Sequence, residues 1–244
     1  MSTDPNSNPA ASQASGFDNF DTFATDYRSI HNDNIKLSGA DSDYFSEYKI
    51  KEIKRVEGTA QVKQILDLGC GDGNSARFFY QHFPQALIEG IDISEDSIEE
   101  AKKREIPGAN FRPYDGSHIP FEDNSFDVCL IATVLHHIRF VHHPDLLREV
   151  LRVLKPGGRL YIFEHNPWNP VTRKVVDNCV FDKDAVLLSP PYSKRVVKEA
   201  GFRQVSNTYT IFFPRSPLFR AFVPLEPFLG FIPVGGQYFT RGVK

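Results

Sequence analysis

The residues best suited to chemistry lie in two segments that each combine an apolar run with an acid. The first run, Ile65 to Leu68, contains Asp67 and leads into three alternating glycines within 69–73. Residues without a Cβ let the backbone turn tightly and approach a ligand closely. The second run, Ala86 to Ile93, carries Asp92 at the end of the expected strand, where a carboxylate can accept hydrogen bonds from a ribose diol. Together the two segments predict a site for a nucleoside-bearing cofactor.

The glycine pattern limits which cofactor fits. A dinucleotide-binding loop follows G-x-G-x-x-G, with the last glycine at the helix entry and backbone N–H groups facing a pyrophosphate. Here the glycines follow G-x-G-x-G, and position 74 is asparagine. Asp67 and Asp72 border the loop with negative charge, which favours a ligand carrying an ammonium and a sulfonium over one carrying two phosphates. An NAD-dependent oxidoreductase is therefore the weaker alternative.

The loop resembles the first motif of the class I S-adenosylmethionine-dependent methyltransferases of the small-molecule type, an acid followed by G-x-G-x-G. Further matches in order and spacing are Asp92, Tyr114-Asp115-Gly116, Phe126 to Leu135 followed by His136-His137, and Leu151 to Tyr161 with Leu-Lys-Pro-Gly-Gly inside it. The resemblance is close from Val62 to His165 and loose beyond. It implies S-adenosyl-L-methionine as cofactor, S-adenosyl-L-homocysteine as product, and a small-molecule or lipid- or glycan-linked methyl acceptor.

The resemblance also assigns roles to particular residues. It implies that Asp67 lies near the cofactor's amino group, that Asp92 holds the ribose, and that Ile93 packs on the adenine. Asp115 would accept from the adenine amine, although it could instead only cap the turn before Gly116. The expected cofactor-binding residues are Asp67, Gly69, Cys70, Gly71, Asn74, Asp92, Ile93, Asp115, Gly116, Ala132 and His137.

Two histidines are candidates for a general base. Methyl transfer from a sulfonium is a direct displacement, so the acceptor must be aligned behind the methyl group and a hydroxyl must lose a proton. A histidine of near-neutral pKa can take that proton, which favours oxygen as the methylated atom. His137 follows the fourth strand and His165 the fifth, at the edge where open α/β sheets bind ligands. The alternatives are cofactor packing or a structural hydrogen bond for His137, and turn closure for His165.

A histidine cluster near the fourth strand invites a metal interpretation, which the spacing disfavours. His136, His137, His142 and His143 fall within eight residues. Adjacent side chains diverge on most backbones, and Cys or carboxylate companions are missing nearby. No metal site is therefore expected, and we expect His142 and His143 at a solvated helix entry before Pro144.

The stretch Glu164 to Pro170, E-H-N-P-W-N-P, resembles a subgroup of these methyltransferases with mostly unassigned acceptors. It lacks the motif expected of quinone C-methyltransferases, which makes that substrate class less favoured. A cofactor-binding pseudoenzyme or regulatory partner also stays open, because the cofactor half is better specified than the acceptor half.

Alternating strand and helix patterns after Gly58 predict crossover connections and a mainly parallel sheet that positions these residues. The expected strands are 62–68, 86–93, 109–114, 126–132, 159–164, 203–213 and 236–243, and the expected helices are 75–83, 95–104, 144–154, 167–180 and 192–200. Ser94 is expected to cap a helix, and Pro156-Gly157-Gly158 to turn a helix into a strand. The resemblance implies an α/β, Rossmann-like three-layer sandwich with strand order 3-2-1-4-5-7-6, an antiparallel last strand and N-terminal cap helices.

Length and composition favour one decorated domain. Residues 59–244 are expected to form the methyltransferase domain, with a helical cap or lid at 17–58 and a disordered tail at 1–16 that lacks the features of a secretory signal. The cap could also only cover a sheet edge. The formal net charge of −3 provides no global field for nucleic acid, and none is expected as a partner. Three cysteines without C-x-x-C spacing favour a reducing, cytoplasmic setting.

Residues 212–235 form an apolar, proline-containing insert. It could be a hydrophobic acceptor pocket, an interfacial patch for a lipid-linked substrate, a covered dimer surface or ordinary core packing. No run approaches the roughly 18 apolar residues of a spanning helix, so no transmembrane segment is expected and peripheral membrane contact stays open. The oligomeric state is not predicted.

Overall fold

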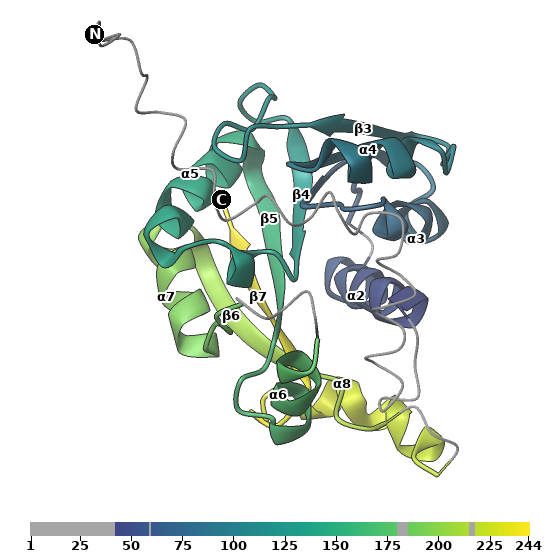
Figure 1. The fold of residues 1–244 in the computed structure, drawn as a ribbon, viewed down its shortest axis with the longest axis vertical. Coiled ribbons are helices and arrows are strands. Elements are labelled where there is room, and N and C mark those ends of the chain that lie inside the picture. The colour runs from purple at the N-terminus through teal and green to yellow at the C-terminus, as the bar shows by residue number, and fades with distance from the viewer. Residues whose placement is uncertain (1–41, 59, 180–184, 215–217) are drawn as a thin grey trace, which may run out of the picture.

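Within the described residues, seven strands form one sheet in the order β3-β2-β1-β4-β5-β7-β6 (Figure 1). The computed structural model describes residues 42–58, 60–179, 185–214 and 218–244. The strands are β1 (Gln64–Leu68), β2 (Leu87–Asp92), β3 (Ala109–Pro113), β4 (Phe126–Ala132), β5 (Leu154–His165), β6 (Arg203–Thr210) and β7 (Gln237–Val243). Neighbours from β3 to β5 run parallel, whereas β7 runs antiparallel to both β5 and β6. The predicted strand order and antiparallel last strand are confirmed.

Helices cover both faces of this sheet, as Figure 1 shows. One face carries α5 (His143–Val153) and α7 (Pro190–Glu199), and the other carries α2 (Ser42–Glu57), α3 (Asn74–His82) and α4 (Glu95–Lys102). The central strands β1 and β4 are buried on both sides along most of their length, as is typical of parallel sheets. Two apolar clusters fill the two interfaces, one around Leu147 and Val197, the other around Ile53 and Phe79. The three-layer sandwich predicted from the resemblance is therefore present.

Side-chain caps fix where two helices begin. Ser94 Oγ accepts a hydrogen bond from the backbone N of Ser97 at 3.1 Å, which confirms the predicted cap of α4. Asn169 Oδ1 accepts from the backbone N of Thr172 at 2.9 Å and starts α6 (Pro170–Asp177). Part of the E-H-N-P-W-N-P stretch therefore serves to cap a helix.

Helix α2 is fixed to the sheet on which it packs. Its Ile50 and Ile53 are fully buried. Near its end, Glu57 accepts a 2.5 Å hydrogen bond from the Tyr161 hydroxyl and forms an ion pair with Arg159. This helix is the part of the predicted cap that the structure describes. The predicted tail at 1–16 and the first part of the cap, through residue 41, lie outside the described residues.

The connection from α5 to β5 differs from the prediction. The helix ends at Val153 and β5 begins at Leu154, so Pro156-Gly157-Gly158 lies inside the start of β5 instead of between helix and strand. Pairing shifts register between Phe126 and Val128 of β4, and such a bulge accommodates the extra residues.

The C-terminal part also corrects two expectations. Strand β6 ends at Thr210, short of the predicted residue 213. The apolar insert contains a 3₁₀ helix, Arg220–Leu225, and the short helix α8 (Glu226–Leu229), neither of which the sequence pattern predicted. Among the residues described, none of the helices has both the length and the apolar character needed to cross a membrane.

Candidate functional site

The glycine loop after β1 is held in a backbone conformation that other residues rarely adopt. Gly69, Gly71 and Gly73 have φ angles of 75°, 52° and 74°. A Cβ on Gly69 would overlap the Val134 side chain, and one on Gly73 would come within 2.9 Å of Phe111 Cζ. A Cβ on Gly71 would meet no atom of the described residues within 4 Å. Gly69 and Gly73 are therefore required by protein packing, whereas the Gly71 backbone is not covered by the described part of the chain.

Asp92, at the end of β2, is tied to this loop. Its Oδ2 accepts from the backbone N of Gly71 at 2.8 Å, and its Oδ1 accepts from the backbone N of Ser94 at 3.0 Å. The side chain is partly exposed. These two hydrogen bonds fix the position of the Asp92 carboxylate beside the loop.

Asp67 lies in β1 and is 1% exposed. Burial, and next the nearby charge of Asp92, raise the pKa of Asp67 to about 7, while Lys49 of α2 opposes the shift. Its Oδ2 makes no hydrogen bond within the described residues. A buried carboxylate oxygen without a donor is costly. The donor that is missing from the described residues is one that an ammonium group of a ligand could supply.

Lys49 brings a cation into the same interior. It is 7% exposed, and burial lowers its pKa to about 8 against the raising effects of Glu164 and Asp67. No pattern around Lys49 in the sequence distinguishes it from a surface lysine of an amphipathic helix, so it was not predicted. Its position follows from the packing of α2 on the sheet.

Asp72 and Asn74 serve the loop's own structure. Asp72 forms an ion pair with Arg104, which follows α4, so its negative charge is offset instead of facing a ligand alone. Asn74 Nδ2 donates to Ser46 Oγ at 2.9 Å and joins α2 to the start of α3. Cys70 is a buried free thiol that lies beside Gly90. The contact of Asn74 and Cys70 with a cofactor stays a prediction.

The proposed adenine end is formed by Ile93 and the turn after β3. A Cβ on Gly116 would lie 3.4 Å from Ile93 Cγ2, so the two residues are adjacent. Asp115 is exposed, and its Oδ1 accepts from the Ser117 backbone N and hydroxyl and from the His118 backbone N. These hydrogen bonds lower the pKa of Asp115. The turn-capping role is therefore present in the structure, and the adenine contact stays a prediction.

The end of β4 bends sharply beside the glycine loop. Ala132 is partly exposed, and the following Thr133 has a φ of 55°. The Thr133 backbone N donates to the Phe163 carbonyl of β5 at 2.8 Å. A β-branched residue in this region is strained and is held by its surroundings. The bend lets Val134 pack over Gly69 and leads the chain into the 3₁₀ turn Leu135–His137.

A buried histidine and glutamate form the polar centre of the site. His136 Nδ1 and Glu164 Oε2 are 2.6 Å apart, with side-chain exposures of 1% and 0%. Glu164 Oε1 accepts from the backbone N of Leu135 at 3.1 Å. The sequence singles out both residues, His136 after the fourth strand and Glu164 at the end of the fifth, but it does not pair them. Both residues lie at the C-terminal ends of adjacent parallel strands, and this shared position is the signal from which their contact could have been predicted.

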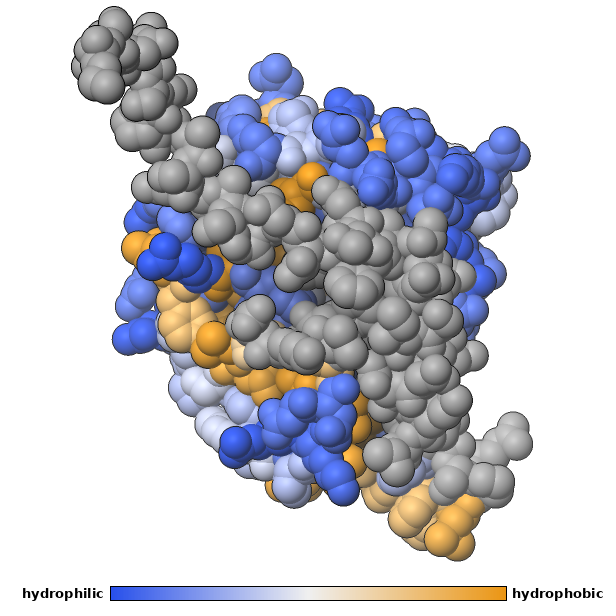
Figure 2. Space-filling view, viewed as in Figure 1, coloured by the Kyte–Doolittle hydropathy of each residue, from blue (hydrophilic) through white to orange (hydrophobic). Residues whose placement is uncertain are grey.

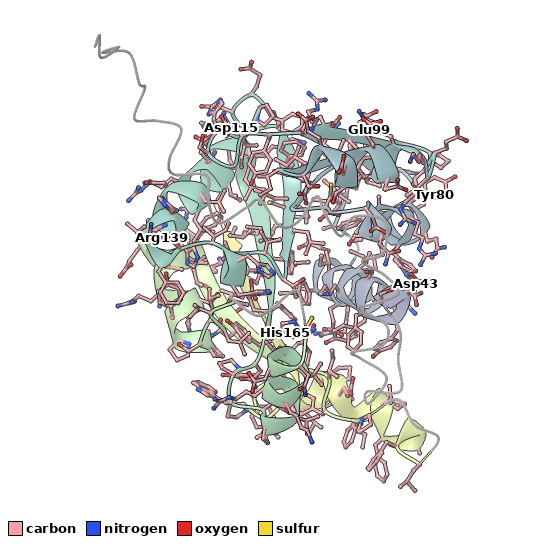
Figure 3. All side chains as sticks on the ribbon, viewed as in Figure 1. Asp43, Tyr80, Glu99, Asp115, Arg139 and His165 are labelled. Atoms are coloured by element: carbon pink, nitrogen blue, oxygen red, sulfur yellow. The ribbon has the colours of Figure 1, made fainter. Side chains whose placement is uncertain are left out.

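The two predicted bases adjoin this pair. The His136 ring centroid lies 4.1 Å from that of His137 and 5.7 Å from that of His165. His165 is the last residue of β5, and Figure 3 shows it in the lower middle of the view, well away from Asp115 at the top. No three metal-binding side chains gather anywhere in the described part of the chain. His137 and His165 thus both lie beside the His136 ring, which Glu164 contacts.

The expectation that His143 is solvated is wrong. His143 is fully buried, and its Nε2 lies 3.0 Å and 2.9 Å from the carbonyl oxygens of Leu135 and Ile138. It thereby stabilises the turn that carries His136 and His137. His142 is exposed, as predicted.

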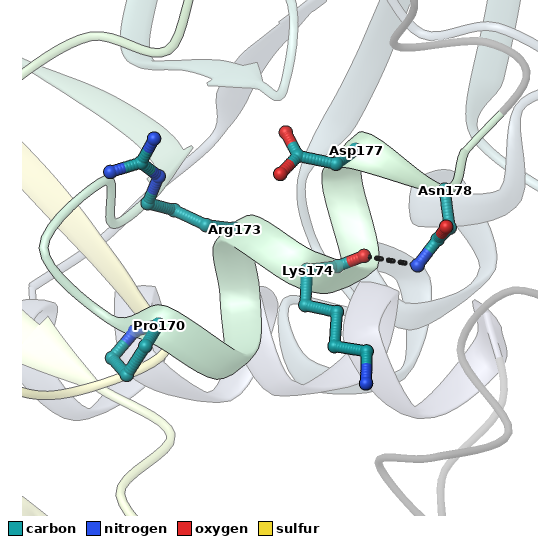
Figure 4. A pocket seen from close by; sticks show the side chains of 5 residues that line it. All are labelled: Pro170, Arg173, Lys174, Asp177 and Asn178. Atoms are coloured by element: carbon teal, nitrogen blue, oxygen red, sulfur yellow. Dashed lines mark hydrogen bonds between the residues drawn. The ribbon is translucent and has the colours of Figure 1, made fainter.

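A hollow on the outer side of α6 is separate from these groups. Pro170, Arg173, Lys174, Asp177 and Asn178 line it (Figure 4). None of them belongs to the glycine loop or to the histidine group. The hollow therefore has no part in the site built above.

Comparison with known proteins identifies the central segment. Residues 65–158 match the family model described as a methyltransferase domain. The chain is 35% identical over 116 residues to phthiotriol/phenolphthiotriol dimycocerosates methyltransferase of Mycobacterium leprae, covering 47% of this chain and 42% of that protein. It is 36% identical over 111 residues to the ubiquinone/menaquinone biosynthesis C-methyltransferase of Desulfotalea psychrophila, covering 45% and 44%. The matched region is thus less than half of either relative.

Solved structures share the fold over most of the chain. A Thermotoga maritima S-adenosylmethionine-dependent methyltransferase, described as a possible histamine N-methyltransferase, matches with a TM-score of 0.66 at 22% identity, covering 92% of this chain and 98% of that one. Phosphoethanolamine N-methyltransferase 2 of Haemonchus contortus, solved with S-adenosyl-L-methionine, matches with a TM-score of 0.62 at 18% identity, covering 92% and 60%. At these identities the likeness establishes the architecture.

Proposed function

The chain belongs to the class I S-adenosylmethionine-dependent methyltransferases, and on this premise we propose that it methylates an oxygen of a small-molecule or lipid- or glycan-linked acceptor. The observation that carries the proposal is the buried Asp67 carboxylate, whose Oδ2 lacks a donor within the described residues. It belongs to the strand that leads into the loop where no described side chain covers Gly71 and Asp92 is fixed in place. This combination suits a ligand with an ammonium group and a ribose.

The fit of the cofactor to these residues can be stated group by group. When bound, S-adenosyl-L-methionine supplies an electrophilic methyl group on a sulfonium. Asp67 would accept from the amino group, and Asp92 would accept from the ribose hydroxyls. Gly71 would let the backbone approach, and Ile93 would pack on the adenine beside Gly116. The negative potential of Asp67 and Asp92 favours a cationic ligand over a pyrophosphate.

Proton removal falls to the histidine group at the ends of β4 and β5. We assign His165 or His137 as the base, because both are partly exposed whereas His136 is buried. Glu164 accepts from His136 Nδ1 in this assignment, which fixes the His136 ring and places a carboxylate close to the two histidines that adjoin it. His136 and Glu164 are thus positioning residues for the two rings that adjoin them.

A second candidate is transfer to carbon, which the similarity to a named C-methyltransferase favours. Carbon methylation of an activated ring also needs proton removal, so the same histidines would serve it. Mass spectrometry and NMR of the methylated product distinguish a new methyl ether or ester from a new carbon-bound methyl group. Binding of S-adenosyl-L-homocysteine without transfer to any lipid or polar extract would favour a non-catalytic partner.

The cofactor site is tested by Asp92→Ala. We expect it to weaken S-adenosyl-L-homocysteine binding tenfold or more, about 1.4 kcal/mol, because paired hydrogen bonds to a diol are lost. Isothermal titration calorimetry measures the change. Asp96→Ala, which removes an exposed acid from the next helix, is the matched control and should bind normally. Unchanged binding by a folded Asp92→Ala protein would remove the assignment.

A further inference from the structure

The C-terminal insert exposes a continuous series of large apolar side chains, which we call the apolar ridge. Its members are Leu218, Phe222, Leu225, Phe228, Phe231 and Val234, with exposed fractions of 77%, 48%, 50%, 75%, 79% and 59%. Single exposed apolar residues are common on soluble proteins, but six within one short segment form a patch of the kind that marks an interaction surface. Figure 2 shows apolar surface at the lower right, where Figure 1 places α8 and the preceding turn.

The acid of this segment is turned away from the ridge surface. Glu226 is the single acidic residue between positions 218 and 234. It is 8% exposed, and its Oε1 accepts from the backbone N of Phe212 at 3.0 Å and of Phe213 at 3.1 Å. The ridge therefore exposes apolar side chains without an exposed carboxylate among them, so it can approach a negatively charged surface without repulsion from its own residues.

Basic and interfacial side chains lie next to the ridge on α6. Asn169 Nδ2 donates to the Val234 carbonyl at 2.7 Å, which ties the start of α6 to the end of the ridge. Arg173 and Lys174 of α6 are exposed, as is Asp177 (Figure 4), which leaves one net positive charge on that surface. Trp168, just before α6, is half exposed. Tryptophan and basic residues beside exposed Phe and Leu are typical of protein surfaces that enter the headgroup region of a bilayer.

We propose that the apolar ridge inserts into the interfacial region of an anionic lipid bilayer, with Arg173 and Lys174 near the headgroups. In Figure 1 the ridge projects from the body of the protein at α8 and the turn before it, whereas an interface between two copies needs a broad matching surface of about 800 Å² on each. The inward position of Glu226 removes a carboxylate that a negatively charged membrane would repel. The proposal does not depend on which acceptor is methylated.

The test is co-sedimentation of the full chain with vesicles of phosphatidylcholine alone and of phosphatidylcholine with an equal part of phosphatidylglycerol. Phe228→Ser with Phe231→Ser should weaken binding to the mixed vesicles about 100-fold, about tenfold for each apolar side chain removed from the membrane. Leu87→Ser with Val141→Ser, which removes two exposed apolar side chains elsewhere, is the matched control and should bind as the wild type does. The double variant Arg173→Gln, Lys174→Gln should bind the mixed vesicles severalfold more weakly than the wild type does, with little change in binding to the neutral vesicles.

Several results would overturn the proposal. One is a wild-type protein that binds neither vesicle, and another is a Phe228→Ser, Phe231→Ser protein that binds as well as the control pair. A third is self-association in sedimentation velocity that the same double variant abolishes, without vesicle binding, because the ridge would then be a contact between copies. Both phenylalanines are largely exposed, so the thermal midpoint should change little and confirm that the variants are folded. These measurements use no cofactor, so failure of the proposed activity would not affect them.

Discussion

Substitution of single loop glycines by alanine separates protein packing from ligand contact. Gly71→Ala places a methyl group where no described residue comes within 4 Å, at a backbone φ of 52°. The left-handed conformation costs an alanine about 1–2 kcal/mol, which corresponds to a fall of about 2–8 °C in the thermal midpoint for a chain of this size. The same methyl group would meet a ligand that lies against the loop. Gly71→Ala should therefore weaken S-adenosyl-L-homocysteine binding about 5- to 150-fold, the equivalent of about 1–3 kcal/mol of overpacking.

Two companion variants make the comparison decisive. Gly157 has a φ of 77°, and a Cβ there would likewise meet no described residue within 4 Å. It lies near the start of β5, outside the glycine loop. Gly157→Ala should lose a similar amount of stability and bind the ligand normally. Gly69→Ala should lose more stability, about 2–5 kcal/mol, because its methyl group also overlaps Val134.

Calorimetry and thermal unfolding on the same protein samples check all three variants. The hydrogen bond from the residue 71 backbone N to Asp92 does not depend on a side chain, so it should persist in Gly71→Ala. If Gly71→Ala bound S-adenosyl-L-homocysteine as tightly as Gly157→Ala, the cofactor would not lie against the loop. If Gly69→Ala were no less stable than Gly157→Ala, the packing of Val134 over the loop would be wrong.

Two further predictions concern the buried acids. Burial raises the folded-state pKa of Asp67 to about 7 from 3.8. At pH values between these two, the folded protein holds a proton that the unfolded chain has released. The contribution of Asp67 to stability therefore falls as the pH rises through this window. The thermal midpoint of the wild type minus that of Asp67→Asn should therefore fall between pH 4 and 7; a constant difference contradicts the burial of an ionisable Asp67. Glu164→Gln should cost about 1.5–3 kcal/mol of stability and move the acidic limb of the pH–rate profile to lower pH, because the base, His165 or His137, loses a nearby carboxylate that favours its protonated form. The exposed Glu99→Gln is its control, and an unchanged profile would exclude the positioning role.

The tight glycine loop could be predicted from the sequence because its determinants are local. Gly69, Gly71 and Gly73 adopt left-handed backbone in one short loop, and Asp92 follows one strand later. Parallel strands joined by helices then have few ways to assemble, so the order of the sheet followed from the resemblance. The packing reason for Gly69 required the structure, since Val134 comes from a different strand end.

The buried polar contacts were harder to predict because they join distant segments of the chain. His136 and Glu164 are 28 residues apart and meet only when β4 and β5 lie side by side. Lys49 enters the interior through the packing of α2, far from either motif. His143 looked like a solvated residue before a proline, but two carbonyl oxygens and the Tyr192 hydroxyl receive its ring in the interior. A polar side chain with buried partners carries no distinct local signal.

A crystal structure with S-adenosyl-L-homocysteine bound tests the central claim most directly. The account predicts the amino group within hydrogen-bond distance of Asp67 Oδ2, the ribose hydroxyls on Asp92, and the backbone of Gly71 against the ligand. A ligand bound elsewhere, or a dinucleotide whose pyrophosphate occupies the loop in its place, would contradict it.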